Sequence, residues 1–298
     1  MKNWFAAGLV VLTFAASSFA AEAAVVDVVA TGFQFTEGAI FVGRSLYFVD
    51  DSGSDVLQLR GESARVVRHQ DGCGANGLLR VPGGLLVACY DRGTLVKISL
   101  DGRVLETIAQ DDAGEHFASP NDLAADAKGG VYFSASGSAG VSGKVFYVSP
   151  RGHVREVATG IAYSNGLVVS LDGTSLYLAE SAAHRLLRYA IAGDGTLSGK
   201  VVFADLNAVL GGPPGTTETP DAVRIDRHGR LFVGLYDGGG FAVIGADSKL
   251  IARVRVPGPH HASLAISPDG AFVYGTTVYD IPGGYRGEIY RTRNPVRE

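Results

Sequence analysis

Short segments of alternating hydrophobic and polar residues run along most of the chain. Between Thr217 and Gly234, a strand-like segment that starts at Pro220-Asp221 is followed by a turn at Gly229 and a second strand-like segment. Short segments rich in Val, Tyr and Phe that are separated by glycines are typical of β-strands joined by tight turns. The chain contains 41 glycines, which fits many such turns. The pattern therefore predicts an all-β protein.

The same arrangement recurs six times. In four segments an Asn or Asp lies eight residues before a turn glycine; these residues are Asn76, Asn121, Asn165 and Asp221. A shortened version begins at Glu37, and in the last segment Ala262 has the equivalent position.

Each repeat has room for four strands. In the second repeat we expect them at 76–81, 85–89, 94–99 and 103–108, with a hairpin turn at Asp101-Gly102 between the last two. Repeats of about 40–50 residues with four strands each predict a six-bladed β-propeller of four-stranded blades. A two-sheet sandwich or another all-β fold is the alternative.

The sixth repeat runs out of chain after its third strand, near Arg291. We expect segment 25–30 to supply the missing fourth strand, because pairing the two ends of the chain closes the ring and leaves no gap between the first and last blades. Residues 25–298 would then form a single propeller domain.

Residues 1–20 have a different character. Lys2 is followed by an apolar run from Phe5 to Phe14 and by small residues near Ala20. This order predicts a secretory signal peptide that is cut between Ala20 and Ala24. A membrane anchor is the alternative, but the apolar run is shorter than the ~20 residues that a span requires. We therefore expect an exported protein, periplasmic or secreted, without a membrane span in its mature form.

The charge and the cysteines add two expectations. The formal net charge is -4 and no basic cluster stands out, which argues against a nucleic-acid partner; we expect a monomer. Export permits a disulfide between Cys73 and Cys89. If Cys89 pairs with a residue near Gly77, only a curled loop would bring the two sulfurs together, so both the bonded and the free state stay open here.

The repeat has a consequence for its polar residues. The first strand of each blade lines the central channel, so Glu37, Asn76, Asn121, Asn165 and Asp221 are expected to converge at one end of it. Two carboxylates that face each other in a narrow channel repel unless a cation lies between them. Carboxylate and amide oxygens suit a hard divalent cation, Ca²⁺ first, with Zn²⁺, Mn²⁺ or Mg²⁺ as substitutes. Taken singly, each Asn is equally well a turn or strand-start residue.

Four motifs carry a resemblance to a known family. The stretches TEGAIF, SPNDLAAD, SNGLVVSLDG and PDAVRID closely resemble motifs of the SMP-30/gluconolactonase/LRE-like family, in the same order along the chain. The resemblance implies a six-bladed propeller with one divalent ion bound by Glu37, Asn165 and Asp221. It also implies that Asn121 contacts the ion or the substrate, and that Asp221 is the general base.

The resemblance implies a metal-dependent lactonase that acts on a small-molecule lactone or ester. Water would attack a carbonyl polarised by the ion, and Asp221 would accept the proton. A phosphotriesterase-like hydrolase, similar to diisopropylfluorophosphatase, is the first alternative; there Asp221 would attack as a nucleophile. A binding propeller or one similar to strictosidine synthase is the second. The chain has no Gly-x-Ser-x-Gly motif that would support a serine triad.

One position departs from the family pattern. Sugar-lactone members of the regucalcin type carry an arginine two residues before the Asn121 position, and this chain has Ser119 there. An aldonolactone is therefore in question as the substrate. The loop 207–219 is a candidate lid or an ordinary insertion. The candidate substrate contacts, of which the last is alternatively a structural histidine, are Asn121, Asn76, Tyr163, His116 and His261.

Overall fold

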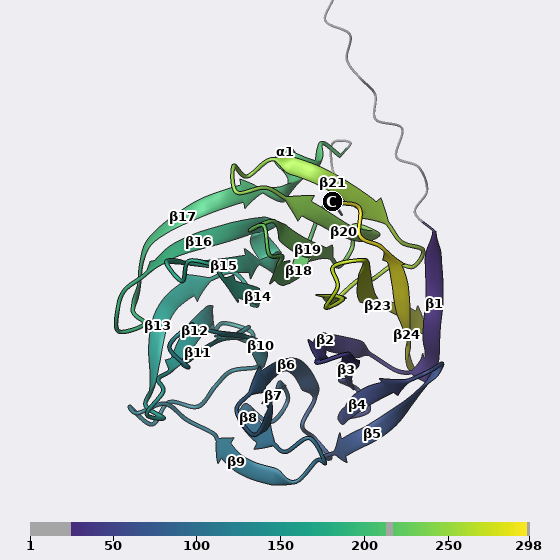
Figure 1. The fold of residues 1–298 in the computed structure, drawn as a ribbon. Helices are drawn as coiled ribbons and strands as arrows, with labels where there is room; N and C mark the ends of the chain where they lie inside the picture. The colour runs from purple at the N-terminus through teal and green to yellow at the C-terminus, as the bar shows by residue number, and fades with distance from the viewer. Residues whose placement is uncertain (1–24, 213–216, 297–298) are drawn as a thin grey trace, which may run out of the picture.

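The computed structural model describes residues 25–212 and 217–296. These residues form six antiparallel sheets of four strands each, arranged as blades around a central channel (Figure 1). The predicted six-bladed β-propeller is confirmed. The predicted signal peptide, residues 1–20, lies outside the described residues and stays a prediction.

Blades 1 to 3 follow one another along the chain, each with its first strand innermost. Blade 1 consists of β2 (Thr36–Val42), β3 (Ser45–Asp50), β4 (Asp55–Arg60) and β5 (Ser63–His69). Blade 2 consists of β6 (Ala75–Val81), β7 (Gly84–Cys89), β8 (Thr94–Ile98) and β9 (Val104–Ile108). Blade 3 consists of β10 (Pro120–Ala125), β11 (Val131–Ala135), β12 (Gly143–Val148) and β13 (Val154–Ile161).

Blades 4 and 5 repeat this order, and blade 6 combines both ends of the chain. Blade 4 consists of β14 (Ser164–Val169), β15 (Ser175–Glu180), β16 (Arg185–Ile191) and β17 (Leu197–Asp205), with the 3-10 turn η1 (Ser181–Ala183) after β15. Blade 5 consists of β18 (Pro220–Ile225), β19 (Leu231–Leu235), β20 (Gly240–Ile244) and β21 (Leu250–Arg255). Blade 6 consists of β22 (Leu264–Ile266), β23 (Phe272–Ile281), β24 (Gly284–Arg293) and β1 (Val26–Phe33).

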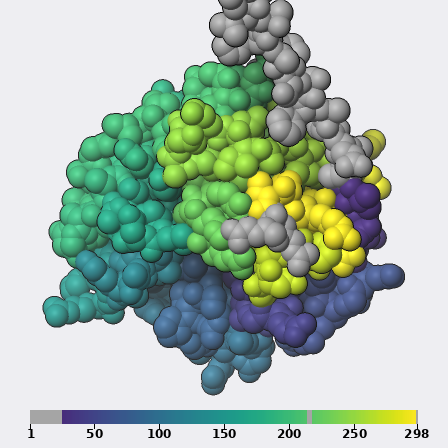
Figure 2. Space-filling model, turned by 45° about the horizontal axis from the view of Figure 1, so that its top comes forward, coloured from purple at the N-terminus to yellow at the C-terminus, as the bar shows by residue number. Residues whose placement is uncertain are grey.

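The ring closes through β1. This strand pairs antiparallel with β24, with Val26 opposite Thr292 and Ala30 opposite Ile289. Figure 2 shows the purple segment near the N-terminus against the yellow C-terminal segment. The predicted closure is therefore confirmed, and β24 is paired on both sides, with β23 and with β1.

The apolar residues of the inner and middle strands pack between adjacent blades. All six residues of β7 are buried, because both faces of this sheet are covered by neighbouring blades. Between blades 2 and 3, the Phe133 and Phe146 rings stack with centroids 5.1 Å apart, and Phe117 packs edge-on against both. Such packing holds each inner strand, and the residues at its start, in a fixed place on the channel wall.

The disulfide left open by the sequence is present: the Cys73 and Cys89 sulfurs are bonded, with Cα atoms 4.6 Å apart. Cys89 pairs with Ala75, not with a residue near Gly77 as expected. A β-bulge between Ala75 and Leu78 shifts the register and brings Cys73 to the end of β7. The bond fixes the segment that leads into Asn76.

The segment 207–219 lies partly in a short helix. α1 (Leu206–Leu210) begins after Asp205, whose carboxylate accepts the Ala208 N–H at 3.0 Å, and ends at Gly211 in a left-handed conformation. Residues 213–216 lie outside the described part of the chain, so the lid stays a prediction. None of the helices in the described residues has the length and apolar character needed to cross a membrane.

Candidate functional site

The first strand of each of blades 1 to 5 begins with a β-bulge. The register shifts between Glu37 and Ile40 in β2, and between Pro220 and Val223 in β18, with equivalent shifts in β6, β10 and β14. A bulge re-aims side chains at the end of a strand. This explains how Asp221 reaches the channel while Val223, two residues later, is fully buried in the core.

The five polar residues predicted to converge do so. Glu37, Asn76, Asn121, Asn165 and Asp221 line one cavity of about 510 Å³. Each is between 6 and 9 % exposed. The same five residues bound a second, small cavity of about 10 Å³, whose wall also includes Asp122, Arg224 and Ser263. They therefore form a polar floor between the wide cavity and the deeper channel.

Glycines behind the floor let the inner strands approach closely. A Cβ added to Gly77 would lie 2.1 Å from the carbonyl oxygen of Asn121, and one added to Gly166 would lie 2.3 Å from that of Asp221. No side chain fits at such distances. Gly77 and Gly166 thus allow the backbone of the inner strand in the next blade to come into contact, which keeps the floor residues close together.

The floor concentrates negative charge. Burial raises the pKa of Glu37 well above its ordinary value, and Asp221 and then Asp51 raise it further. Burial also raises the pKa of Asp221, as does Asp122, while a hydrogen bond from the Asn165 amide opposes this. Two buried carboxylates without a cation between them are electrostatically unfavourable.

This donor set fits a hard divalent cation. It offers two carboxylates and three amide oxygens, and no sulfur or imidazole. Within the described ranges, no three His, Cys, Asp or Glu side chains group into a metal-binding cluster. Asn oxygens would therefore have to complete the shell around any ion held here.

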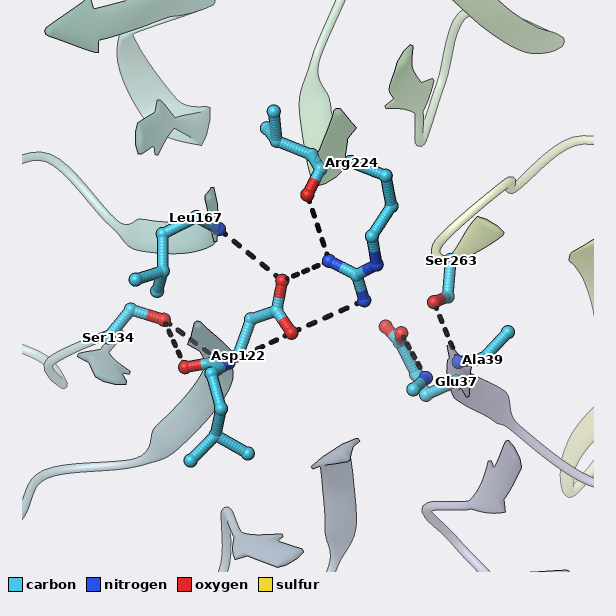
Figure 3. A network of polar contacts seen from close by, with 10 residues as sticks. Glu37, Ala39, Asp122, Ser134, Leu167, Arg224 and Ser263 are labelled. Atoms are coloured by element: carbon cyan, nitrogen blue, oxygen red, sulfur yellow. Dashed lines mark hydrogen bonds and ion pairs between the residues drawn. The ribbon is translucent and has the colours of Figure 1, made fainter. Parts of the chain in front are cut away.

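Below the floor, a buried ion pair crosses the channel (Figure 3). Arg224 donates to both carboxylate oxygens of Asp122, at 2.6 and 3.3 Å, although the two residues belong to blades 5 and 3. The Asp122 carboxylate also accepts the backbone N–H groups of Leu123 at 2.9 Å and Leu167 at 3.3 Å. In Figure 3 the Glu37 side chain points toward the same central space. The sequence analysis did not identify this pair.

Several further cavity residues, of which only Tyr236 was expected on this rim from the sequence, share one position. The residue directly after the second strand of a blade lines the cavity in blades 1, 2, 4 and 5; these residues are Asp51, Tyr90, Ser181 and Tyr236. Asp51 accepts a hydrogen bond from the Asn76 amide at 3.3 Å, and burial raises its pKa to about 6. The repeat phase that located the floor would have located these residues too.

Of the other predicted contacts, Tyr163 lines the cavity and the two histidines do not. The Tyr163 hydroxyl lies 3.1 Å from the Tyr90 hydroxyl, and the Tyr163 backbone has a φ of 64°. His116 is exposed outside the cavity, with Nδ1 3.0 Å from the carbonyl oxygen of Ala109. His261 is 1 % exposed, and its Nε2 lies 3.2 Å from the carbonyl oxygen of Gly258. The structure thus does not bring His116 or His261 to the predicted substrate site. His261 is instead a buried structural histidine, the alternative named from the sequence.

We expect His261 to make the protein sensitive to acid. Burial lowers its pKa from 6.5 to about 4. Below pH 6.5 His261 binds a proton in the unfolded chain but not in the folded protein. The stability that neutral His261 contributes is therefore fully present above pH 6.5 and is lost as the pH falls towards 4. Between pH 7.5 and 4.5 the free energy of unfolding, measured with urea, should fall by about 2–3 kcal/mol more in the wild type than in His261→Gln. Equal losses in the two proteins would contradict this.

Comparison with known proteins places the chain in a family. The family model of the SMP-30/gluconolactonase/LRE-like region matches residues 35–279. A pentonolactonase of Haloferax volcanii is 28% identical over 278 residues, which cover 89% of this chain and 88% of that protein. The lactonase drp35 of Staphylococcus saprophyticus is 29% identical over 201 residues, or 65% of this chain and 60% of that protein. The structure of a calcium-binding protein, regucalcin from Agrobacterium tumefaciens, superposes with a TM-score of 0.67 at 18% identity, over 88% of this chain and 92% of that one. The chain belongs to the SMP-30/gluconolactonase/LRE-like family.

Proposed function

We propose that the protein is a metal-dependent hydrolase that opens lactone rings. The observation that carries this proposal is the polar floor, where Glu37 from blade 1 and Asp221 from blade 5 share one cavity with three Asn residues. The cavity reaches the surface, because Tyr163 and Tyr285 in its wall are 42 and 39 % exposed. Similarity to a pentonolactonase and to a lactonase supports a lactone as the substrate class.

The ion would be held by Glu37, Asn165 and Asp221, with Asn121 beside them. Ca²⁺ suits this irregular oxygen set best, and Zn²⁺, Mn²⁺ and Mg²⁺ are the alternatives. The bound ion would supply Lewis-acid polarisation of the lactone carbonyl. The similarity to regucalcin, described as a calcium-binding protein, supports calcium.

The protein groups would handle the water and the proton. Asp221 would accept a proton from the water that attacks the carbonyl carbon. The Asn165 amide, which hydrogen-bonds to the Asp221 carboxylate, would hold that carboxylate in place. Asn121 and Asn76 would orient the substrate from the floor. Because Arg224 and Asp122 lie across the deeper channel, substrate and water would enter from the wide cavity.

Metal removal tests the proposal. We expect chelated, dialysed protein to lose at least about 99 % of its lactonase activity, and refilling with Ca²⁺ to restore it. Saturating Ca²⁺, at about 100 times its Kd, should also raise the melting temperature of the stripped protein by roughly 5 °C. Initial rates on a set of lactones, together with thermal unfolding, measure both effects.

Two variants make the metal test specific. Glu37→Gln removes one ligand charge and should abolish most of the Ca²⁺-induced rise in melting temperature. Asp237→Asn changes a carboxylate that lies outside the cavity wall, where it accepts the Thr219 hydroxyl at 3.1 Å, and should keep that rise. Full activity in protein shown by elemental analysis to be metal-free would overturn the metal requirement.

A further inference from the structure

The rest of the cavity wall is largely aromatic. Five aromatic rings line the same space as the polar floor; they belong to Phe35, Tyr90, Tyr163, Tyr236 and Tyr285. Aromatic rings offer flat apolar surfaces that stack on other flat or apolar groups. A wall of this composition favours a ligand with an apolar part.

Contacts behind the wall hold these rings in place. The Phe35 and Tyr285 rings pack edge to face with centroids 4.9 Å apart. The Tyr236 ring stacks on His260 at 4.4 Å, and His260 Nε2 in turn lies 2.9 Å from an Asp280 carboxylate oxygen. The apolar surfaces are therefore formed before a ligand arrives, which reduces the entropy lost on binding.

Four hydroxyls of the wall have partners within the protein. Those of Tyr90 and Tyr163 face each other at 3.1 Å. The Ser181 hydroxyl donates to the carbonyl oxygen of Pro220 at 2.6 Å, and that of Thr219 donates to Asp237 at 3.1 Å. The hydroxyls of a sugar lactone that lie against these four groups would meet hydroxyls that are already paired, and an unpaired buried hydroxyl weakens binding.

The wall also selects by charge. If an ion offsets Glu37 and Asp221, the carboxylates of Asp51 and Asp91 remain. No lysine or arginine lines the cavity in the part of the chain that the structure describes. Ser119, the position at which the sequence analysis noted a departure from the family pattern, is not in the cavity wall; its carbonyl oxygen accepts the Ser136 N–H at 2.8 Å. An anionic ligand would be repelled.

From these observations we infer that the substrate is an uncharged lactone with an apolar or aromatic substituent, and not a sugar lactone or an acidic lactone. The inference rests on the proposed lactonase function and specifies its substrate class. The floor would hold the lactone ring, and the aromatic wall would contact the substituent.

Three γ-lactones with different substituents test the inference on Ca²⁺-loaded protein. γ-Phenyl-γ-butyrolactone carries a phenyl group, D-galactono-1,4-lactone carries hydroxyls, and isocitric lactone carries carboxylates. We expect kcat/KM for the phenyl lactone to exceed that for each of the other two by roughly 100-fold. Unsubstituted γ-butyrolactone, with the same ring, should lie between them.

A pair of variants assigns the preference to the wall. Tyr236→Ala should lower the ratio of kcat/KM for the phenyl lactone over γ-butyrolactone by roughly 5-fold, because the substituent loses one ring contact. Tyr236→Phe keeps the ring and should keep the ratio within about twofold. An unchanged ratio in Tyr236→Ala would overturn the role given to this wall.

The outcomes separate this inference from the function beneath it. Preferred turnover of the galactonolactone or of isocitric lactone would overturn the substrate class and leave the lactonase proposal intact. Turnover of none of the four lactones by metal-loaded, folded protein would overturn the lactonase proposal, and the substrate class with it.

Discussion

Asp221→Asn is expected to lower kcat for lactone hydrolysis by about 10²- to 10⁴-fold, the range that a general base contributes. Asn has nearly the same shape as Asp and keeps an oxygen that can face an ion. It cannot accept a proton from water. Asp221 is 7 % exposed at the start of β18, so no bulk buffer ion replaces it easily. Steady-state rates at saturating Ca²⁺ and saturating lactone measure the effect.

Metal binding has to be followed in the same variant. Isothermal titration calorimetry of Asp221→Asn with Ca²⁺ shows whether the ion still binds, so that loss of the base is not confused with loss of the ion. Asp237→Asn is the matched control on the same face of the propeller, and its kcat should stay within about twofold of the wild type. An Asp221→Asn enzyme that binds Ca²⁺ and retains more than a tenth of the wild-type kcat would exclude Asp221 as the base.

Arg224→Ala is expected to destabilise the fold by about 3–5 kcal/mol, because it leaves a buried carboxylate without its partner. The Asp122 side chain is 6 % exposed and that of Arg224 is 17 % exposed, so the pair is largely removed from bulk water. Removing one member of a buried pair costs more than the pair itself contributes. Urea unfolding at neutral pH and a fixed Ca²⁺ concentration gives the free energy.

Two further variants isolate the cause. Lys249→Ala breaks an exposed pair, in which Lys249 is 82 % and Asp247 61 % exposed, and should cost at most about 1 kcal/mol. Adding Asp122→Asn to Arg224→Ala removes the unpaired charge and should recover at least about 1 kcal/mol. If Arg224→Ala alone lost less than about 1 kcal/mol, the pair would not be a structural element of the channel.

Asp122 below the floor and Asp221 in the floor have different partners. The two carboxylates are nevertheless close enough for Asp122 to raise the pKa of Asp221. Asp122 has the Arg224 guanidinium at 2.6 Å and two backbone N–H groups. Asp221 accepts its hydrogen bond from the neutral Asn165 amide, and the Arg224 charge lowers its pKa less than this hydrogen bond does. The protein thus supplies its own cation for the deeper carboxylate, and leaves the floor carboxylates to an ion from solution under the proposed function.

The fold and the floor could be predicted because they depend on local, repeated features. Similar strand lengths and turn glycines recur from blade to blade. In the second blade, each strand therefore begins and ends within one residue of its predicted bounds. The floor follows from the same phase, since equivalent residues of a symmetric ring meet at its axis. The residues after the second strands, such as Tyr90 and Tyr236, obey that phase too and were identifiable in principle.

The sequence by itself thus determined the six-bladed ring, its closure by β1 and the convergence of Glu37, Asn76, Asn121, Asn165 and Asp221. Tertiary structure alone decided the Cys73–Cys89 bond, because a bulge set the register beside it. It also decided the Asp122–Arg224 pair and the position of His261 away from the cavity. These features depend on where a side chain points across a gap between blades or within a curled loop, and neither the spacing of residues nor their alternation encodes that direction.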